Sequence, residues 1–357
     1  MTRQETDRNI DNIVDSNPLN LGQNKVFVIA EAACNHMCDL QLAKVMIDEA
    51  AKAGADSIKF QTYKSERMVT KNAEAYWGSE TMSQQEYYKR LDKFEEEDYR
   101  ELFDYSKKQG IIAFSTPFSI EDAIMLNDLD MEIFKLPSFE IVNLELLNCV
   151  AEFQKPIILS TGASTFEEID NAVSVITKVN PKLVLMACTL SYPTEYDDAN
   201  LMRIKTLKDR YPNIMIGISD HTPPESNMVI PAFSVSLGAR VVEKHYTLSR
   251  KLTGSGHFFS LEPKDLKKMV SNIRLFERTI GDGFQGLSHS EERAVKSGRK
   301  SIVANKHIKK NTKINRDHLS FKRPGNGISP DKLDEVLGKV VLVDYDPDDQ
   351  IKLGDIK

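Results

Sequence analysis

Long apolar runs, abundant cysteine and a basic excess are all missing from this chain. Its 357 residues include 47 Lys and Arg against 53 Asp and Glu, so the formal net charge is −6. A mildly acidic chain is a poor match for nucleic acid or an anionic membrane surface. No apolar stretch approaches the length that spans a bilayer, and the polar first twenty residues lack the apolar core of a signal peptide. We therefore expect a cytoplasmic protein whose partners include neither nucleic acid nor a membrane.

The four cysteines, Cys34, Cys38, Cys149 and Cys188, are too few for a disulfide framework. Cys34 and Cys38 lie four residues apart, which is too close for comfortable pairing, and no second such pair follows to complete a zinc site. We predict reduced, mostly buried thiols, as is usual in the cytoplasm.

Apolar residues make up 41% of the chain, which is enough for one large core and a small second one. From about residue 25 onward, short and nearly continuous apolar runs alternate with segments of helical spacing. Such runs are typical of parallel strands buried on both faces. There are eight of them, at residues 25–33, 57–62, 111–117, 133–138, 156–161, 183–189, 215–221 and 239–246.

Helical spacing between these runs completes a repeating β/α pattern. It is found at residues 40–54, 119–129, 165–179 and 225–238. Gly54 is the predicted C-cap of the first helix, and Ser164 or Thr165 the N-cap of the third. Eight β/α repeats predict a (β/α)₈ TIM barrel. An open doubly wound sheet is the alternative, but no Gly-x-Gly-x-x-Gly follows the first strand.

The chain divides by composition into four parts. We predict an N-terminal extension at 1–24, the barrel at 25–280, a linker rich in Gly, Ser and charge at 281–297, and a small domain at 298–357. The long polar and aromatic segment 63–100 follows the second strand. It is therefore expected over the C-terminal face of the barrel, as a lid or substrate loop with a helix.

Barrel enzymes carry their chemistry at the C-terminal ends of the strands, and two lysines lie there in this chain. Lys59 and Lys135, with the hydroxyls of Ser138 and Ser160 also at predicted strand ends, predict a site for a small anion of two or three charges. The alternative is that each lysine pairs with a carboxylate at a strand end. Glu31 is the best isolated carboxylate for proton transfer or metal binding, unless it forms a salt bridge to Lys59.

His221 and His245 end consecutive predicted strands, so their imidazoles are expected to converge. Two histidines with water and a substrate oxygen suit a divalent ion such as Mn²⁺, Mg²⁺ or Fe²⁺ in an open site. The alternative is a pair of hydrogen-bonded structural histidines.

Taken together, the motifs at the strand ends resemble those of the sialic acid synthase family, which includes N-acetylneuraminate, pseudaminate and legionaminate synthases. They are IAEAACNHMCDLQLAKVMIDEAAKAGADSIKFQT, FSTPF, KLPSFE, STG, YPTE, GISDHT and EKHYTL, in the family's order. The later segments RKSIVANKHIKKNTKI and LSFKRPGNGIS resemble its antifreeze-like (SAF) domain. The resemblance covers about residues 25–345 and implies a TIM barrel followed by that domain.

The resemblance implies a role for each candidate residue. Phosphoenolpyruvate would be bound by Lys59, Thr116, Lys135, Ser138, Ser160 and Ser219. Glu31 and Gln61 would flank the reacting carbons, with Glu31 as acid or base. His221 and His245 would hold a divalent metal, Mn²⁺ first, with Mg²⁺ or Co²⁺ as alternatives. Tyr192 would line the sugar pocket, and Arg323 would reach from the antifreeze-like domain into the partner's barrel, which implies a domain-swapped homodimer.

Two departures from the family pattern fall near the expected sugar site. Leu190 stands where the family has asparagine, and Gly256 where it has aspartate. His257 is the candidate replacement for that aspartate, with Ser255 as the alternative. KLPSFE and TLSR look more like the pseudaminate-type members. We therefore expect intact donor and metal sites and a different acceptor.

The predicted reaction condenses phosphoenolpyruvate with a sugar aldehyde, an N-acetylmannosamine-like or otherwise modified hexosamine. It forms a sialic-acid-like 2-keto-3-deoxy acid and releases phosphate by C–O cleavage. Two alternatives remain. One is a metal-dependent keto-acid aldolase or lyase, and the other is an inactive sugar-binding homologue.

Overall fold

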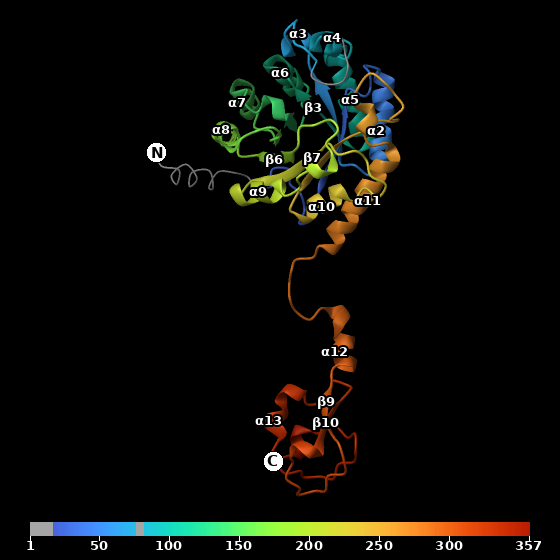
Figure 1. The fold of residues 1–357 in the computed structure, drawn as a ribbon, viewed down its shortest axis with the longest axis vertical. Helices are drawn as coiled ribbons and strands as arrows, with labels where there is room; N and C mark the ends of the chain where they lie inside the picture. Colours follow the sequence, from blue (N-terminus) through green and yellow to red (C-terminus); the bar gives the residue numbers. More distant parts are fainter. Residues whose placement is uncertain (1–16, 76–81) are drawn as a thin grey trace. The chain divides into compact units, whose positions relative to one another are not determined.

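The computed structural model describes residues 17–75 and 82–357 and divides the chain into two compact units, one ending at Gly281 and the other beginning at Asp282 (Figure 1). The predicted extension is therefore described only at 17–24. No helix of the described residues is long and apolar enough to cross a membrane. All four cysteines are free, and Cys34 and Cys188 are buried whereas Cys38 and Cys149 are half-buried.

The first unit contains an eight-stranded parallel sheet in the order β3-β2-β1-β8-β7-β6-β5-β4. The two strands at the ends of this order, β3 and β4, contact each other, so the sheet closes into a barrel. Each predicted apolar run contains one strand, and the open-sheet alternative was wrong. The strands are β1 (Phe27–Ala33), β2 (Ser57–Thr62), β3 (Ile112–Pro117), β4 (Phe134–Leu136), β5 (Ile157–Ser160), β6 (Leu183–Cys188), β7 (Met215–Asp220) and β8 (Val241–His245).

Helices follow the strands and surround the barrel (Figure 1). All four predicted helical segments contain a helix. The barrel helices are α2 (Leu40–Ala53), α3 (Ser65–Met68), α4 (Gln84–Lys89), α5 (Glu96–Gln109), α6 (Ile120–Asp128), α7 (Leu144–Glu152), α8 (Phe166–Thr177), α9 (Arg203–Arg210), α10 (Ile230–Ser236) and α11 (Pro263–Thr279).

Local sequence signals determine where these helices begin and end. Gly54 closes α2 with a φ of 85°, a left-handed conformation that glycine adopts at little cost. Thr165 caps α8 by accepting from the backbone N–H of Glu168, whose carboxylate bonds back to the cap. Both caps were predicted, with Thr165 rather than Ser164 in the second.

The core lies between the sheet and the helices. Every residue of β1, β6 and β7 is buried, which explains why these strands are almost continuously apolar. Gly217 on β7 leaves room for its neighbour, because a Cβ there would come within 2.6 Å of the Val241 carbonyl oxygen on β8. A larger residue would push the two strands apart.

The segment between β2 and β3 begins with α3 and α4 and ends with α5. Residues 76–81 of this predicted lid lie outside the described residues. A small apolar cluster of Cys34, Tyr63 and Leu91 anchors the segment beside the end of β1. Its position after β2 agrees with the expected side of the barrel, and its role as a lid stays a prediction.

The second unit has its own core, formed by residues that include Ile302, Leu319, Val336 and Ile351. Its two antiparallel strands are β9 (Ser301–Ala304) and β10 (Leu319–Lys322), and α13 spans Leu333–Val336. The predicted linker is not irregular throughout, because a 3₁₀ turn at His289–Glu291 and helix α12 (Glu292–Gly298) occupy its second half.

Candidate active site at the C-terminal ends of the strands

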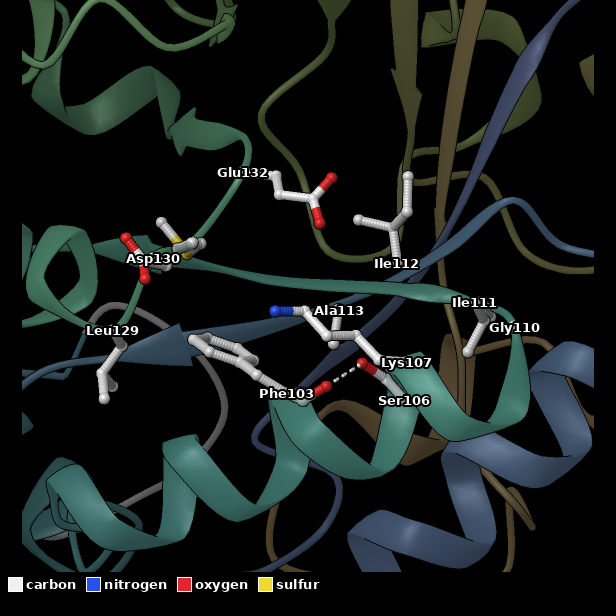
Figure 2. Close-up of a pocket in the computed structure, with 11 residues that line it drawn as sticks. Phe103, Ser106, Lys107, Gly110, Ile111, Ile112, Ala113, Leu129, Asp130 and Glu132 are labelled. Atoms are coloured by element: carbon white, nitrogen blue, oxygen red, sulfur yellow. Dashed lines mark hydrogen bonds between the residues drawn. The ribbon is translucent and has the colours of Figure 1, made fainter.

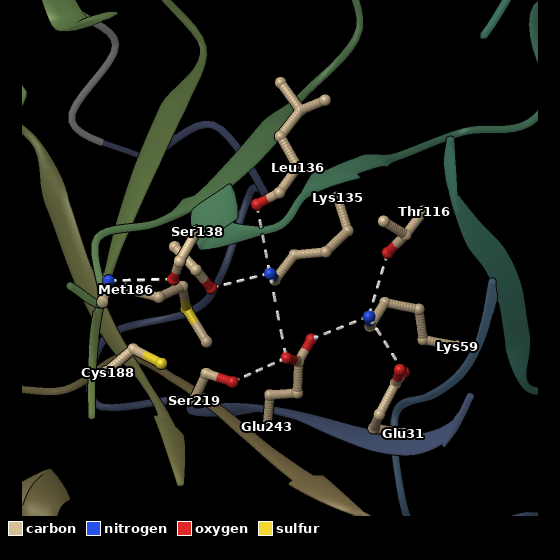
Figure 3. Close-up of polar contacts among 12 residues, drawn as sticks. Glu31, Lys59, Thr116, Lys135, Leu136, Ser138, Met186, Cys188, Ser219 and Glu243 are labelled. Atoms are coloured by element: carbon tan, nitrogen blue, oxygen red, sulfur yellow. Dashed lines mark hydrogen bonds and ion pairs between the residues drawn. The ribbon is translucent and has the colours of Figure 1, made fainter. Parts of the chain in front are cut away.

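Four buried charged side chains form the centre of the candidate site. They are Glu31 on β1, Lys59 on β2, Lys135 on β4 and Glu243 on β8, each no more than 4% exposed. Figure 3 shows them as an alternating row. The Lys59 Nζ lies 2.9 Å from Glu31 Oε2 and 3.6 Å from Glu243 Oε2. The other oxygen of Glu243 lies 3.8 Å from the Lys135 Nζ. Two positive and two negative charges offset one another, which makes their burial tolerable.

Hydroxyl groups from neighbouring elements also hydrogen-bond to members of this row or lie beside it. Lys59 donates to Thr116 Oγ1 at 2.9 Å, and Lys135 donates to Ser160 Oγ at 2.7 Å. Ser219 donates to Glu243 Oε1 at 2.8 Å. Ser138 accepts from the backbone N–H of Gly162 at 2.8 Å. The structure thus brings together all six residues predicted for the phosphoenolpyruvate site, namely Lys59, Thr116, Lys135, Ser138, Ser160 and Ser219.

Burial and charge act in opposite directions on the four ionisable groups. Burial raises the pKa of Glu31 to about 7, although Lys59 opposes the rise. Burial disfavours the charged form of Lys59, but Glu243 and Glu31 outweigh it and raise the pKa of that lysine. The pKa of Lys135 is lowered, mainly by burial. Burial also works against ionised Glu243, yet Lys135 and Lys59 prevail and lower its pKa. Glu31 is therefore the member of the row that can exchange a proton near neutral pH.

The carboxylate pairing that the sequence offered as the alternative for the lysines is present in this structure, and the anion site stays a prediction. Each lysine has a carboxylate neighbour, and the two lysines also share one, Glu243, which was not among the predicted site residues. Its position in β8, two residues before His245, was the signal that could have identified it. Gln61 is half-buried and donates to Glu31 Oε1 at 3.3 Å, so the two predicted catalytic residues are in contact.

The two predicted metal ligands also lie together. His221 follows β7, His245 ends β8, and their ring centroids are 5.3 Å apart. The His221 Nδ1 lies 3.0 Å from the Thr189 carbonyl oxygen. If the Nδ1–H donates a hydrogen bond to this oxygen, Nε2 is unprotonated and its lone pair is available to a metal. Burial holds the pKa of His245 well below its usual value, so the ring is neutral, as a metal ligand requires.

The residues near the histidines fit an open metal site rather than a closed one. The buried Nδ1 of His245 has no hydrogen-bond partner within the described part of the chain. No cluster of three or more His, Cys, Asp or Glu suited to a metal occurs at residues 17–75 and 82–357. This chain would supply two ligands, and water and substrate oxygens would supply the others.

A buried ion pair connects the strands that carry the histidines. Lys244 on β8 donates to Asp220 on β7 at 2.7 Å, and both side chains are nearly inaccessible to solvent. Lys244 also donates to the carbonyl oxygen of Thr222 at 2.6 Å and to its hydroxyl at 3.1 Å. The lysine therefore holds the residues on both sides of His221, while it is itself adjacent to His245.

The predicted sugar-site residues are distributed less compactly. Tyr192 lies over His221, with ring centroids 4.3 Å apart. His257 is fully buried, and its Nδ1 lies 2.7 Å from Thr247 Oγ1, so its ring belongs to the interior of the loop. Arg323 follows β10 in the second unit and is exposed. Leu190 lies beside Gly162, whose hypothetical Cβ would be 3.2 Å from that of Leu190.

A second hollow lies away from these residues, between the end of α5 and the starts of β3 and β4 (Figure 2). Its volume is about 200 Å³, and Phe103, Lys107, Asp130 and Glu132 are among the residues that line it. This is the N-terminal side of the strands, and none of the predicted site residues contributes to it. The candidate chemistry therefore stays with the opposite strand ends.

The closed parallel sheet, with buried lysines, carboxylates and histidines gathered at one side, defines a TIM barrel, a fold in which enzymes carry their chemistry at the C-terminal ends of the strands. Residues 46–285 match the NeuB family, and residues 299–357 match the SAF domain. The chain therefore belongs to the NeuB family.

Relatives of known name agree with this assignment. The chain is 39% identical to N,N'-diacetyllegionaminic acid synthase of Campylobacter jejuni over 92% of this chain and 99% of that relative. It is 34% identical to pseudaminic acid synthase of the same species, over 93% and 97%. The crystal structure of the N-acetylneuraminic acid synthetase of Leptospira borgpetersenii aligns with a TM-score of 0.70 at 38% identity, covering 78% of this chain and 93% of that one. The predicted family, architecture and enzyme class are thereby confirmed.

Proposed function

We propose that the protein condenses phosphoenolpyruvate with an N-acylated aldose to give a sialic-acid-like 2-keto-3-deoxy acid and phosphate. The observation that carries this proposal is the pair of buried lysines bridged by Glu243 at the strand ends. The named synthases among its relatives support the same reaction class. They do not favour the aldolase or the inactive homologue.

The donor fits the site by charge and by hydrogen bonding. Phosphoenolpyruvate carries a carboxylate and a phosphate, and the ammonium groups of Lys59 and Lys135 would face these two anions. The hydroxyls of Thr116, Ser138 and Ser160 lie within the same cluster and would donate to their oxygens. The four free thiols suit the reducing cytoplasm, where we place the reaction.

His221 and His245 would hold the divalent ion, Mn²⁺ in the first place, with Mg²⁺ or Co²⁺ as alternatives. When bound, the ion would polarise the aldehyde oxygen of the acceptor. The Thr189 carbonyl would orient the His221 ring by accepting from its Nδ1, and the pair of Lys244 and Asp220 connects the strands that carry the two histidines.

The steps that follow need a base and a stabilised leaving group. C3 of the donor attacks the aldehyde carbon, a water adds to C2, and the C2–O bond to phosphate then breaks. Glu31, oriented by Gln61, is placed to take the proton of that water, and its raised pKa suits this exchange near neutrality. Lys59 and Lys135 stabilise the charge that moves to the departing phosphate.

We also propose a domain-swapped homodimer in which Arg323 of each chain completes its partner's barrel. Apolar side chains exposed on the C-terminal side of the barrel support the proposal that a second chain covers this side. Phe139, Val142 and Phe166 are each at least 44% exposed there.

Mixing two inactive variants tests this arrangement. Chains with Lys135→Met and chains with Arg323→Ala should together recover about a quarter of wild-type activity, since only mixed dimers contain an intact site. No recovery after mixing, with dimers present by light scattering, would show that Arg323 serves its own barrel or none.

Phosphate release tests the reaction itself. The protein with Mn²⁺ and phosphoenolpyruvate is offered N-acylated hexosamines, deoxy-hexosamines and plain aldoses, and each product is weighed by mass spectrometry. Donor labelled with ¹⁸O at the bridging oxygen should transfer the label to phosphate, because C–O cleavage leaves that oxygen on phosphorus.

Lys135→Met should lower kcat/KM by about 10² to 10³, while Lys52→Met at an exposed position should leave it unchanged. The absence of phosphate with every acceptor would overturn the proposal. Release of pyruvate from a keto acid without phosphate would indicate the aldolase instead.

A further inference from the structure

The hollow between the end of α5 and the starts of β3 and β4 combines two kinds of surface (Figure 2). Buried apolar side chains line it, and Phe103, Leu129 and Met131 are each no more than 8% exposed. Three exposed charged residues line it as well. Lys107 reaches it from α5, and Asp130 and Glu132 come from the segment that leads into β4. The hollow therefore offers an apolar interior beside charges of both signs.

The charged residues of the hollow are not paired with one another. Within the described part of the chain, Lys107 forms no salt bridge with Asp130 or Glu132, so its ammonium lies beyond ion-pairing distance of both carboxylates. Lys155 offsets part of the acidic charge without a salt bridge of its own. A ligand with both an ammonium and a carboxylate would contact an opposite charge with each group.

The volume of the hollow restricts the ligand to a small molecule. The hollow measures about 200 Å³. An apolar cavity of about 150 Å³ holds benzene, so this one has room for an apolar group of the size of a leucine or phenylalanine side chain. A simple inorganic ion would leave the apolar walls uncovered.

The hollow lies at an exceptional seam of the barrel. Within the described residues, the other neighbouring strands are joined by hydrogen-bonded ladders, whereas β3 and β4 contact each other without one. The Ser115 backbone N–H on β3 instead donates to the Met131 Sδ, just before β4, at 3.1 Å. Sulfur is a weak acceptor, so this contact holds the two strands less firmly than a ladder would.

Both strands of this seam lead to the proposed donor site. Thr116 on β3 accepts from Lys59, and Lys135 on β4 donates to Ser160. A ligand in the hollow would join α5 to the segment before β4 and would contact Met131. It would therefore restrict the separation of β3 and β4, and so hold Thr116 and Lys135 in place.

We propose that this hollow is an effector site for a small zwitterion with an apolar group, the class of free apolar α-amino acids, and that its occupation strengthens the binding of phosphoenolpyruvate. The ammonium of the ligand faces Asp130 and Glu132, and its carboxylate faces Lys107. Its apolar group packs on Phe103 and Met131. The inference goes beyond the proposed condensation, and only the coupling to the donor rests on that proposal.

Binding is tested with L-leucine and two analogues that each lack one charge, isocaproate without the ammonium and isopentylamine without the carboxylate. Titration calorimetry and saturation-transfer NMR on the full chain measure it. Leucine should bind with a Kd of about 1 mM, as suits so small a ligand. Each analogue should bind about fivefold more weakly, because the charges at the exposed rim are partly screened.

Two variants locate the bound leucine. Lys107→Met and Glu132→Gln should each raise its Kd about fivefold. Lys107→Met should leave the binding of isopentylamine unchanged, since that amine has no carboxylate for the lysine to contact. The matched control is Lys108→Met, an exposed neighbour on α5 that does not line the hollow, and it should keep the wild-type Kd.

The coupling is measured by titrating phosphoenolpyruvate without an acceptor, so that no turnover occurs. Saturating leucine should lower the Kd for phosphoenolpyruvate about fivefold. Saturating phosphoenolpyruvate should lower the Kd for leucine by the same factor, because such coupling is reciprocal.

The outcomes separate this inference from the proposed condensation. No binding of leucine at millimolar concentration, equal binding of both analogues, or a Kd unchanged in both variants would overturn the site. An unchanged Kd for phosphoenolpyruvate in leucine would overturn its role as an effector site. If phosphoenolpyruvate does not bind the wild type at all, the condensation and the coupling fail, whereas the analogues and variants still decide whether the hollow binds the amino acid.

Discussion

Replacing Lys244 with methionine should destabilise the barrel far more than the loss of an ordinary lysine. The substitution leaves the Asp220 carboxylate, 4% exposed, without the ammonium that lies 2.7 Å away. It also removes two further hydrogen bonds, to the carbonyl and the hydroxyl of Thr222. Breaking a buried pair on one side costs about 3 to 5 kcal/mol, because an uncompensated charge stays in the interior.

This free energy translates into a large thermal shift. A domain of the barrel's size loses about 2 to 4 °C of Tm per kcal/mol, so Lys244→Met should lower Tm by roughly 6 to 20 °C. Calorimetry in EDTA measures this change in Tm without any contribution from bound metal. Adding Asp220→Asn should restore part of the loss, because it removes the stranded charge.

The matched control is Lys205→Met. Lys205 pairs with Asp209 at 3.0 Å one turn along α9, but both side chains are more than half exposed. Such a pair contributes only about 0.3 to 0.5 kcal/mol. If Lys244→Met shifts Tm no more than this control, or if the double variant is no more stable than Lys244→Met, the reasoning is refuted.

Three further predictions follow from the site and the core. Because burial raises the pKa of Glu31 to about 7, turnover should rise with pH as this carboxyl loses its proton across roughly pH 6 to 8. Glu31→Gln should flatten that limb at a low rate, and a wild-type kcat profile level through pH 7 would contradict the role. His221→Ala should abolish metal-dependent turnover and weaken Mn²⁺ binding in titration calorimetry with the fold kept, whereas unchanged turnover would refute the metal assignment. Gly217→Ala should destabilise the protein by about 1 to 3 kcal/mol, since its Cβ would lie 2.6 Å from the Val241 carbonyl oxygen. Gly354→Ala, with no atom within 4 Å of its Cβ, is the control, and equal midpoints in urea would argue against this packing.

The charged row illustrates how far local sequence reasoning reaches. Lys59 and Lys135 were predicted to share a site because both were assigned to the polar C-terminal ends of predicted strands, which gather at one side of a barrel. Glu243 was missed, because its contact with both lysines depends on how β8 lies relative to β2 and β4. The spacing of residues along the chain does not reveal the distances between Glu243 and the two lysines.

The residues predicted for the sugar site show the same limit more clearly. Gly256 was noticed as a departure from a family pattern, and His257 was the candidate to replace the missing aspartate. The structure instead buries His257 completely and places the Phe259 ring where a side chain at position 256 would need to be. Steric exclusion of this kind involves atoms three residues apart on a turn, and only coordinates reveal it.

The sequence by itself determined the elements: eight buried strands, the caps at Gly54 and Thr165, and the polar residues at the strand ends. Hydrophobic periodicity and capping act within a few residues, so the order of residue types is enough to specify them. Tertiary structure alone decided which of those polar groups form ion pairs, how Lys244 connects the strands that carry the histidines, and which aromatic rings lie beside the histidines. These contacts depend on closure of the barrel, which brings Glu243 within ion-pairing distance of two lysines more than a hundred positions away. Burial of these charges is tolerable only because they offset one another.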